Sequence, residues 1–170
     1  MDVLWLSRTD AERAVAPPAD LPAGVRVADW SLDSALERRR LDLTKAVSRT
    51  IPRAGHLSEA LADVALAAYD RGASRRVGAA LRLLSTGRTV ITDRLHGHIL
   101  CMLLGIPHVL LDNGYGKLRA FHETWTYGSP LVARAADPAE ALAMALTRLD
   151  QDQPRRPVGP WATAASSASR

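Results

Sequence analysis

Short apolar runs and stretches of helical periodicity alternate along the chain, and this alternation predicts its secondary structure. Val3–Leu6 and Val25–Trp30 are expected to be strands, the first buried and the second alternating between apolar and polar residues. Helices are expected at residues 33–49, 58–69 and 74–84, with a break at Gly72 between the last two. The first half of the chain therefore contains two strands followed by mainly helical sequence.

The segment that follows predicts a strand–helix–strand unit. Thr89–Ile91 is a short β-branched run and should form a buried strand. Thr92 or Asp93 can cap the next helix, Gly105 ends it, and His108–Leu111 should form a further buried strand. Such a unit places two parallel strands side by side through a right-handed crossover.

The remaining segments complete an α/β pattern. Leu118–Trp125 and Pro138–Leu149 are expected to be helices, and Leu131–Ala133 a strand. Residues 151–170 are rich in Pro, Ser, Ala and Arg and are predicted to form a disordered tail. Residues 1–150 are therefore expected to be one α/β domain, an open and mostly parallel Rossmann-like sheet with helices on both faces.

Composition narrows the class of protein. The chain is 47% hydrophobic and 24% charged, which is typical of globular proteins and excludes a wholly disordered chain. No apolar run approaches the ~20 residues of a membrane span, and the N-terminus lacks the pattern of a secretory signal. The single cysteine, Cys101, excludes an internal disulfide and favours a reducing compartment. We therefore expect a cytoplasmic protein without a transmembrane segment, and peripheral membrane association stays open.

Positive charge is concentrated between Arg71 and Arg119. The net charge is +4, but between Arg71 and Arg119 eight basic residues face only two acids, Asp93 and Asp112. This surplus implies an anionic ligand or partner, although for most of these arginines a solvated face is the alternative. Nucleic acid is not the expected partner, because aromatic residues interleaved with the basic ones are lacking.

Cationic residues follow three of the predicted strands, at the edge where open α/β sheets bind their ligands. Arg8 follows the first strand, Arg94 follows the third, and Lys117 closes the loop after the fourth. Arg94 and His96 also fall in the first turn of a helix, where free amides and the helix dipole attract anions. These positions predict a phosphate or carboxylate pocket that contains one titratable group, His96.

The sequence also contains a His-x-His pair, His96 and His98, close to Asp93. On a helix, residues two apart do not face each other, so no metal site is expected. His98 is interpreted as a packed or exposed helix residue, and His96 as either a capping or core residue or a functional group. Cys101 and His108 are interpreted as structural residues because they lie in apolar segments.

Four motifs between Ser85 and Trp125 resemble, in this order, those of the polysaccharide pyruvyl transferase family. They are TDRLHG at 92–97, LGIP at 104–107, DNGYGK at 112–117 and ETW at 123–125. An earlier segment, Arg8-Thr9-Asp10 with Glu12, is similar to the R-T-D-x-E segment of the family.

The resemblance implies a fold similar to one lobe of the two-lobed glycosyltransferase-B arrangement. It also implies transfer of pyruvate from phosphoenolpyruvate to a sugar of a surface or exported polysaccharide, forming a ketal without a metal or another cofactor. Arg94, Leu95 and His96 would bind phosphoenolpyruvate, with Arg8 as an additional ligand, and His96 would supply the proton. Lys117 is assigned to the same pocket from its position, and the acceptor would be a glycan or lipid-linked saccharide.

Members of this family normally carry another lobe ahead of these motifs. We therefore expect the chain to correspond to the C-terminal, donor-binding half of such an enzyme, to lack the acceptor half and to be inactive alone. Two alternatives remain. One is a glycosyltransferase-like lobe that binds a nucleotide sugar, and the other is a non-catalytic remnant.

Overall fold

The computed structural model describes residues 1–8, 16–30, 39, 42–43, 46, 58–112 and 116–150. The chain divides into two compact units, Met1–Asp29 with Leu83–Arg170, and Trp30–Arg82. Of the helix predicted at 33–49, only residues 39, 42, 43 and 46 are described, and all four are helical. The predicted tail at 151–170 lies outside the described residues, as do Thr9, Asp10 and Glu12.

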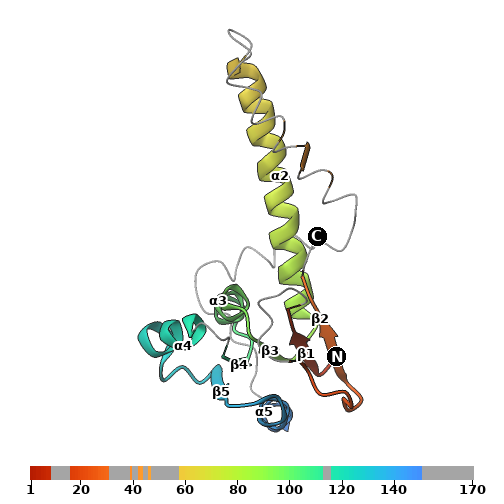
Figure 1. Cartoon of the computed structure of the whole chain (residues 1–170), viewed down its shortest axis with the longest axis vertical. Coiled ribbons are helices and arrows are strands. Elements are labelled where there is room, and N and C mark those ends of the chain that lie inside the picture. The colour runs from red at the N-terminus through yellow and green to blue at the C-terminus, as the bar shows by residue number, and fades with distance from the viewer. Residues whose placement is uncertain are drawn as a thin grey trace, which may run out of the picture. The chain divides into compact units, whose positions relative to one another are not determined.

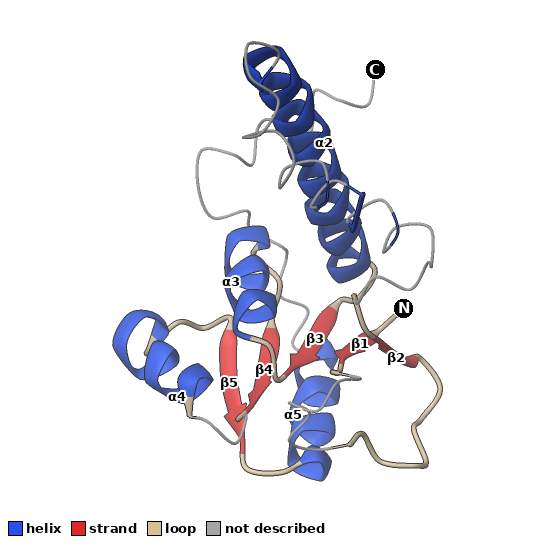
Figure 2. Ribbon diagram, turned by 45° about the horizontal axis from the view of Figure 1, so that its top comes forward, coloured by secondary structure: helices blue, strands red, loops and turns tan. Residues whose placement is uncertain are grey.

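Five strands form one parallel sheet in the first unit (Figures 1 and 2). In spatial order they are β2 (Val25–Ala28), β1 (Val3–Leu6), β3 (Thr89–Thr92), β4 (His108–Leu111) and β5 (Val132–Ala135). This arrangement confirms the expected open, Rossmann-like α/β sheet. The predicted boundaries of β2 and β5 are off by up to two residues, since β2 ends at Ala28.

Helices cover both faces of the sheet, as expected. Successive residues of a strand point to opposite faces. Trp5 and Ile91 belong to the core that α5 (Pro138–Asp150) closes through its buried Ala141 and Ala145. Thr92, the residue after Ile91, points to the other face and lies under α3 (Leu95–Leu104).

The two ends of helix α3 compare differently with the prediction: the predicted start is wrong, and the predicted end is confirmed. The predicted cap at Thr92 or Asp93 is wrong: the N-cap residue is Arg94, which makes no side-chain cap bond. Thr92 is still part of the strand, and its Oγ1 accepts a hydrogen bond from the Arg94 amide at 3.1 Å. At the other end Gly105 adopts φ 65°, and the amides of Gly105 and Ile106 bond back to the last turn. This left-handed turn confirms the predicted helix end.

The predicted break at Gly72 is wrong. A single helix, α2, runs over the 28 residues Ser58–Ser85. Glycine keeps its amide and only weakens a helix, by about 1 kcal/mol relative to alanine. Gly72 is flanked by Ala, Arg and Leu, which are strong helix formers, so propagation continues through it.

The connection from β4 to β5 is also not the single helix predicted at 118–125. It consists of α4 (Lys117–Phe121) and a π-helical turn, η3 (His122–Thr126). The hydroxyl group of Thr124 donates to the carbonyl oxygen of Ala120, four residues earlier, at 2.8 Å. Such a side-chain bond competes with the helical ladder, and it accompanies the wider turn here.

Candidate functional site

The register of the sheet brings the ends of three strands to one edge. Ala28, Leu6 and Thr92 are aligned neighbours on β2, β1 and β3. The residues after them therefore leave the sheet side by side: Asp29, Ser7 with Arg8, and Asp93 with Arg94. The chain order reverses direction across the sheet between β1 and β3, and ligands of open α/β sheets bind at such a switch point.

An ion pair spans this edge. The Arg94 guanidinium Nη2 bonds to Asp29 Oδ1, and the two side chains are only 13% and 6% exposed. Sequence reasoning missed Asp29 because the strand was expected to extend to Trp30. Its signal was present, since Asp29 immediately follows a strand at the ligand-binding edge.

The charged side chains at this edge form a cluster: Asp29, Arg8, Arg94 and Asp93. Asp93 interacts with the charges of the other three. It is 6% exposed, and among the described residues its Oδ1 atom has no hydrogen-bond partner. Burial raises the pKa of Asp93, and nearby Asp29 adds to this, whereas its own backbone amide and the charges of Arg94 and Arg8 oppose the shift. Both predicted donor-binding arginines, Arg8 and Arg94, are therefore close enough to act on one carboxyl group.

The first turn of α3 lies beside this cluster. The first helical bond runs from the His98 amide to the Arg94 carbonyl oxygen, at 3.0 Å. The amides of Leu95, His96 and Gly97 therefore have no acceptor within the helix, and they favour an anion. Leu95 is half-buried and His96 is exposed. The edge thus combines arginines, free helical amides and one exposed imidazole.

Lys117 is placed one strand further along the same edge. It is exposed and is the first residue of α4, which follows the loop after β4 and packs against α3. Residues 113–115 of the predicted DNGYGK loop lie outside the described residues.

The DRLHG motif thus begins at the end of β3 and supplies both Asp93 and Arg94 to the edge. Residues 30–115, about half of the chain, match the model of the polysaccharide pyruvyl transferase family. The chain belongs to this family.

Two curated proteins of related sequence match shorter segments. "Pyruvyl transferase 1" of Schizosaccharomyces pombe is 48% identical over 63 residues, which are 36% of this chain and 16% of that protein. "Putative pyruvyl transferase EpsO" of Bacillus subtilis is 45% identical over 51 residues, which are 30% of this chain and 16% of that protein. The match therefore spans about one-sixth of the length of each relative.

In this pyruvyl transferase family member, two histidines of the matched segment form a buried pair. His98 and His108 are both fully buried, and their Nδ1 and Nε2 atoms are 2.7 Å apart. His98 is thus a packed residue, one of the two readings the sequence left open. The signal for the pair was that His98 directly precedes the apolar run Ile99–Ile106 and that His108 begins an apolar strand.

The pair belongs to a longer chain of hydrogen bonds whose direction can be assigned. The Ile106 carbonyl oxygen can only accept, so His108 Nδ1 donates to it, at 2.8 Å. His98 Nδ1 must then donate to His108 Nε2, and the Thr126 hydroxyl to His98 Nε2, at 3.0 Å. His122 Nδ1 in turn donates to Thr126 Oγ1, at 2.9 Å.

Both buried rings are held in the neutral form. Burial lowers the pKa of His98 to about 4 and that of His108 to about 3. Because each buried nitrogen is already engaged within the protein, this cluster is structural. It ties α3, which contains His96, to β4 and to η3. Across the described residues, no group of three His, Cys, Asp or Glu side chains could hold a metal ion.

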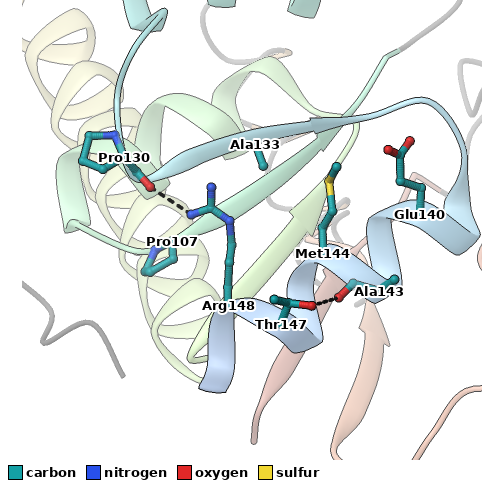
Figure 3. Close-up of a pocket in the computed structure, with 8 residues that line it drawn as sticks. All are labelled: Pro107, Pro130, Ala133, Glu140, Ala143, Met144, Thr147 and Arg148. Atoms are coloured by element: carbon teal, nitrogen blue, oxygen red, sulfur yellow. Dashed lines mark hydrogen bonds between the residues drawn. The ribbon is translucent and has the colours of Figure 1, made fainter. Parts of the chain in front are cut away.

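An open pocket of about 380 Å³ runs along α5 beside β5 (Figure 3). Its polar side chains are engaged with backbone atoms. Arg148 Nη1 donates to the Pro130 carbonyl oxygen at 2.9 Å, and Glu140 Oε2 accepts from the Ala136 amide at 2.6 Å. Pro130 and Pro107 precede β5 and β4, so this part of the pocket lies at the amino ends of the strands. The carboxyl edge is therefore the better candidate site.

No helix in the described part of the chain is long and apolar enough to cross a bilayer.

Proposed function

We propose that this chain is the donor-binding part of a polysaccharide pyruvyl transferase and that its donor is phosphoenolpyruvate. The pyruvate would be transferred to a sugar of a polysaccharide as a ketal. Membership of the family and the names of the two relatives support the transferase class. The choice of donor rests on the chemistry of the carboxyl edge.

The observation that carries the proposal is the strand register that aligns Leu6 with Thr92 and so brings Arg8 and Arg94 to the same edge at the β1/β3 switch point. Phosphoenolpyruvate carries a phosphate and a carboxylate, two groups that the arginine fork binds in bidentate fashion. The free amides at the start of α3 add donors for a phosphate. The edge therefore offers complementary groups for both ends of the donor.

Within this proposal each predicted residue has a role. Arg94, Leu95 and His96 contact the donor, Arg8 binds it from β1, and Lys117 adds positive charge from the start of α4. Each of the five lies at the carboxyl edge of the sheet.

His96 is proposed as the acid. Its proton goes to the methylene carbon, using the electron pair of the double bond, and a sugar hydroxyl attacks the neighbouring carbon. Phosphate takes up the proton of this hydroxyl as it leaves, and a second hydroxyl closes the ketal and returns its proton to His96. Imidazole is the side chain that most often transfers protons in catalysis, and the exposure of His96 leaves it accessible to a ligand.

The test is calorimetric titration of the full chain with phosphoenolpyruvate, inorganic phosphate and UDP-glucose. We expect phosphoenolpyruvate to bind more tightly than phosphate, because it engages two anion sites, and UDP-glucose not to bind. Binding of UDP-glucose alone would instead identify a nucleotide-sugar lobe. Absence of any binding would identify a non-catalytic remnant.

The acceptor is proposed to be a glycan or a lipid-linked saccharide, and the compartment to be the cytoplasm. The free, buried thiol of Cys101 suits a reducing compartment.

A further inference from the structure

The Oδ1 atom of Asp93 is an unusual feature of the carboxyl edge. Asp93 and Asp29 are both about nine-tenths buried or more. Asp29 Oδ1 is bonded to the Arg94 guanidinium, whereas Asp93 Oδ1 has no hydrogen-bond partner in the described part of the chain. A buried carboxylate oxygen left in this way is costly, and a hydrogen-bond donor that reached it would relieve this cost.

Capping of α3 does not account for Asp93. The N-cap of this helix is Arg94, and no side chain bonds to the first amides. Asp93 is instead the first residue beyond β3, at the edge where the charges of Arg8 and Arg94, the proposed ligands of the donor anion, both act on it. Its carboxyl group therefore has to coexist with the negative charge of that ligand.

The charges around Asp93 determine how it can do so. Arg8 after β1 and Arg94 next in the chain favour the ionised carboxylate, while burial and Asp29 after β2 favour the neutral acid. An anion bound by Arg8 and Arg94 would offset their charges and add a negative charge of its own. Both effects favour the neutral acid of Asp93, as burial and Asp29 do.

Hydrogen-bond chemistry leads to the same conclusion. Phosphate and carboxylate oxygens of the ligand can only accept hydrogen bonds, and so can an ionised aspartate. Two acceptors can share a contact only if a proton lies between them.

We propose that Asp93 takes up a proton from solvent when the anionic donor binds, and that the resulting O–H group donates a hydrogen bond to the donor. The inference rests on the proposed function for the identity of the donor, phosphoenolpyruvate. Asp93 then becomes a binding residue of the reaction whose protonation is coupled to donor affinity.

Coupling of this kind is reciprocal. If donor binding raises the affinity of Asp93 for a proton, protonation of Asp93 must raise the affinity for the donor by the same factor. The affinity should therefore fall, by up to about tenfold per pH unit, as pH rises from the pKa of Asp93 in the free protein to its higher pKa in the complex. Asparagine has the size of the protonated acid and donates at every pH, so Asp93→Asn should remove this dependence.

The experiment is calorimetry of phosphoenolpyruvate binding to the full chain, in buffers of different ionisation enthalpy. The buffer dependence gives the number of protons taken up per binding event. We expect wild type to take up more protons than Asp93→Asn, by up to one per site, and the variant to retain affinity at neutral pH. The titration of the ligand itself is common to both proteins and cancels. Asp2→Asn, an exposed change ahead of β1 at the opposite edge, should behave as wild type.

Equal proton uptake by wild type and Asp93→Asn would overturn the inference. So would loss of binding by a folded Asp93→Asn protein, because the ionised carboxylate would then be the required form. If the variant does not fold, infrared difference spectra of wild type should show a protonated carboxyl band that appears when the ligand binds. Absence of this band would also overturn the inference.

Failure of the proposed function can be distinguished from failure of the inference about Asp93. If phosphoenolpyruvate does not bind but sulfate does, the donor assignment fails, and the proton count with sulfate, which carries no proton of its own at neutral pH, still tests Asp93. Absence of binding by either anion would overturn both.

Discussion

The imidazoles of His98 and His108 are joined by a hydrogen bond in the interior, where neither ring reaches solvent. The pair links the helix that follows the DRLHG motif to the neighbouring strand. Because both rings are neutral in this arrangement, their protonation opposes folding.

Acid should therefore destabilise the protein through this pair. The pKa of His98 is about 4 and that of His108 about 3, both below the ordinary value of 6.5. As pH falls below 6.5, the unfolded chain binds more protons than the folded one, so stability falls, by up to about 1.4 kcal/mol per pH unit for each histidine. The full stabilisation is present above pH 6.5. Urea unfolding between neutral pH and about pH 5 measures this slope.

His98→Asn keeps a donor toward His108 but removes one titrating ring. It should be less stable at neutral pH and show a shallower acid slope than wild type. His96→Asn, a change at an exposed histidine, should keep the wild-type slope. An unchanged slope in His98→Asn would show that the pair does not control acid stability.

The two ion pairs Arg94–Asp29 and Arg134–Glu123 should differ in their contributions to stability. The first is almost fully buried, while the side chains of the second are 42% and 55% exposed. Asp29→Asn leaves a buried guanidinium without its counter-charge and should cost on the order of 3 kcal/mol. Glu123→Gln should cost less than about 1 kcal/mol. Similar losses in chemical denaturation would contradict the assignment of Arg94–Asp29 as a buried pair.

Arg94→Lys tests the anion site itself. Lysine keeps the positive charge but loses the fork, so phosphoenolpyruvate affinity should fall by about tenfold or more. Arg134→Lys, on an exposed arginine of β5, is the matched control and should bind normally. Calorimetry measures both, and unchanged affinity in folded Arg94→Lys would place the anion elsewhere.

Sequence reasoning predicted the parts of this fold that depend on local pattern. The β-branched run of β3 and the glycine at the end of α3 identify their elements unaided, because burial and a left-handed turn restrict the residue types there. The continuity of α2 through Gly72 was missed because glycine counts as a stop signal, although the helix-forming neighbours that explain it are present in the sequence.

Residues of the candidate site could be predicted only where their position along the chain places them next to the end of a strand or the start of a helix. Arg8 and Arg94 come shortly after predicted strands, and His96 lies in the first turn of a predicted helix. Their position at the carboxyl edge of the sheet could therefore be expected. The Asp29–Arg94 and His98–His108 pairs could not, because each depends on strand register and helix packing between segments that are separate in the sequence.

His96→Asn separates donor binding from chemistry. Asparagine retains a donor but cannot supply a proton near neutral pH. In a protein that contains both lobes, we expect appreciable phosphoenolpyruvate binding with pyruvyl transfer slowed about 10²–10⁴-fold. The rate of transfer is measured beside donor affinity. Near-normal turnover would mean that His96 only binds the donor and that another group is the acid.

Gly97 and Gly72 should respond in opposite ways to alanine. A Cβ on Gly97 would lie 2.7 Å from Thr92 Oγ1, a buried atom already bonded to the Arg94 amide, and 3.1 Å from Leu6. Gly97→Ala should therefore lower stability by about 1–3 kcal/mol. Gly72 has no neighbour within 4 Å, and Gly72→Ala should raise stability by about 0.5–1 kcal/mol. Thermal unfolding measures the stability change in both variants. A stabilised Gly97→Ala protein would show that α3 can move off the sheet.

The missing side chain of Gly97 has a consequence for how the site can change. It lets the start of α3 rest directly on β1 and β3, the two strands that flank the switch point. The amides that face the anion are therefore set when the sheet folds, and ligand binding need not order them. Under the proposed function, a change of donor preference would come from side chains or loops at this edge and not from a shift of α3, because moving α3 would require the sheet to be repacked.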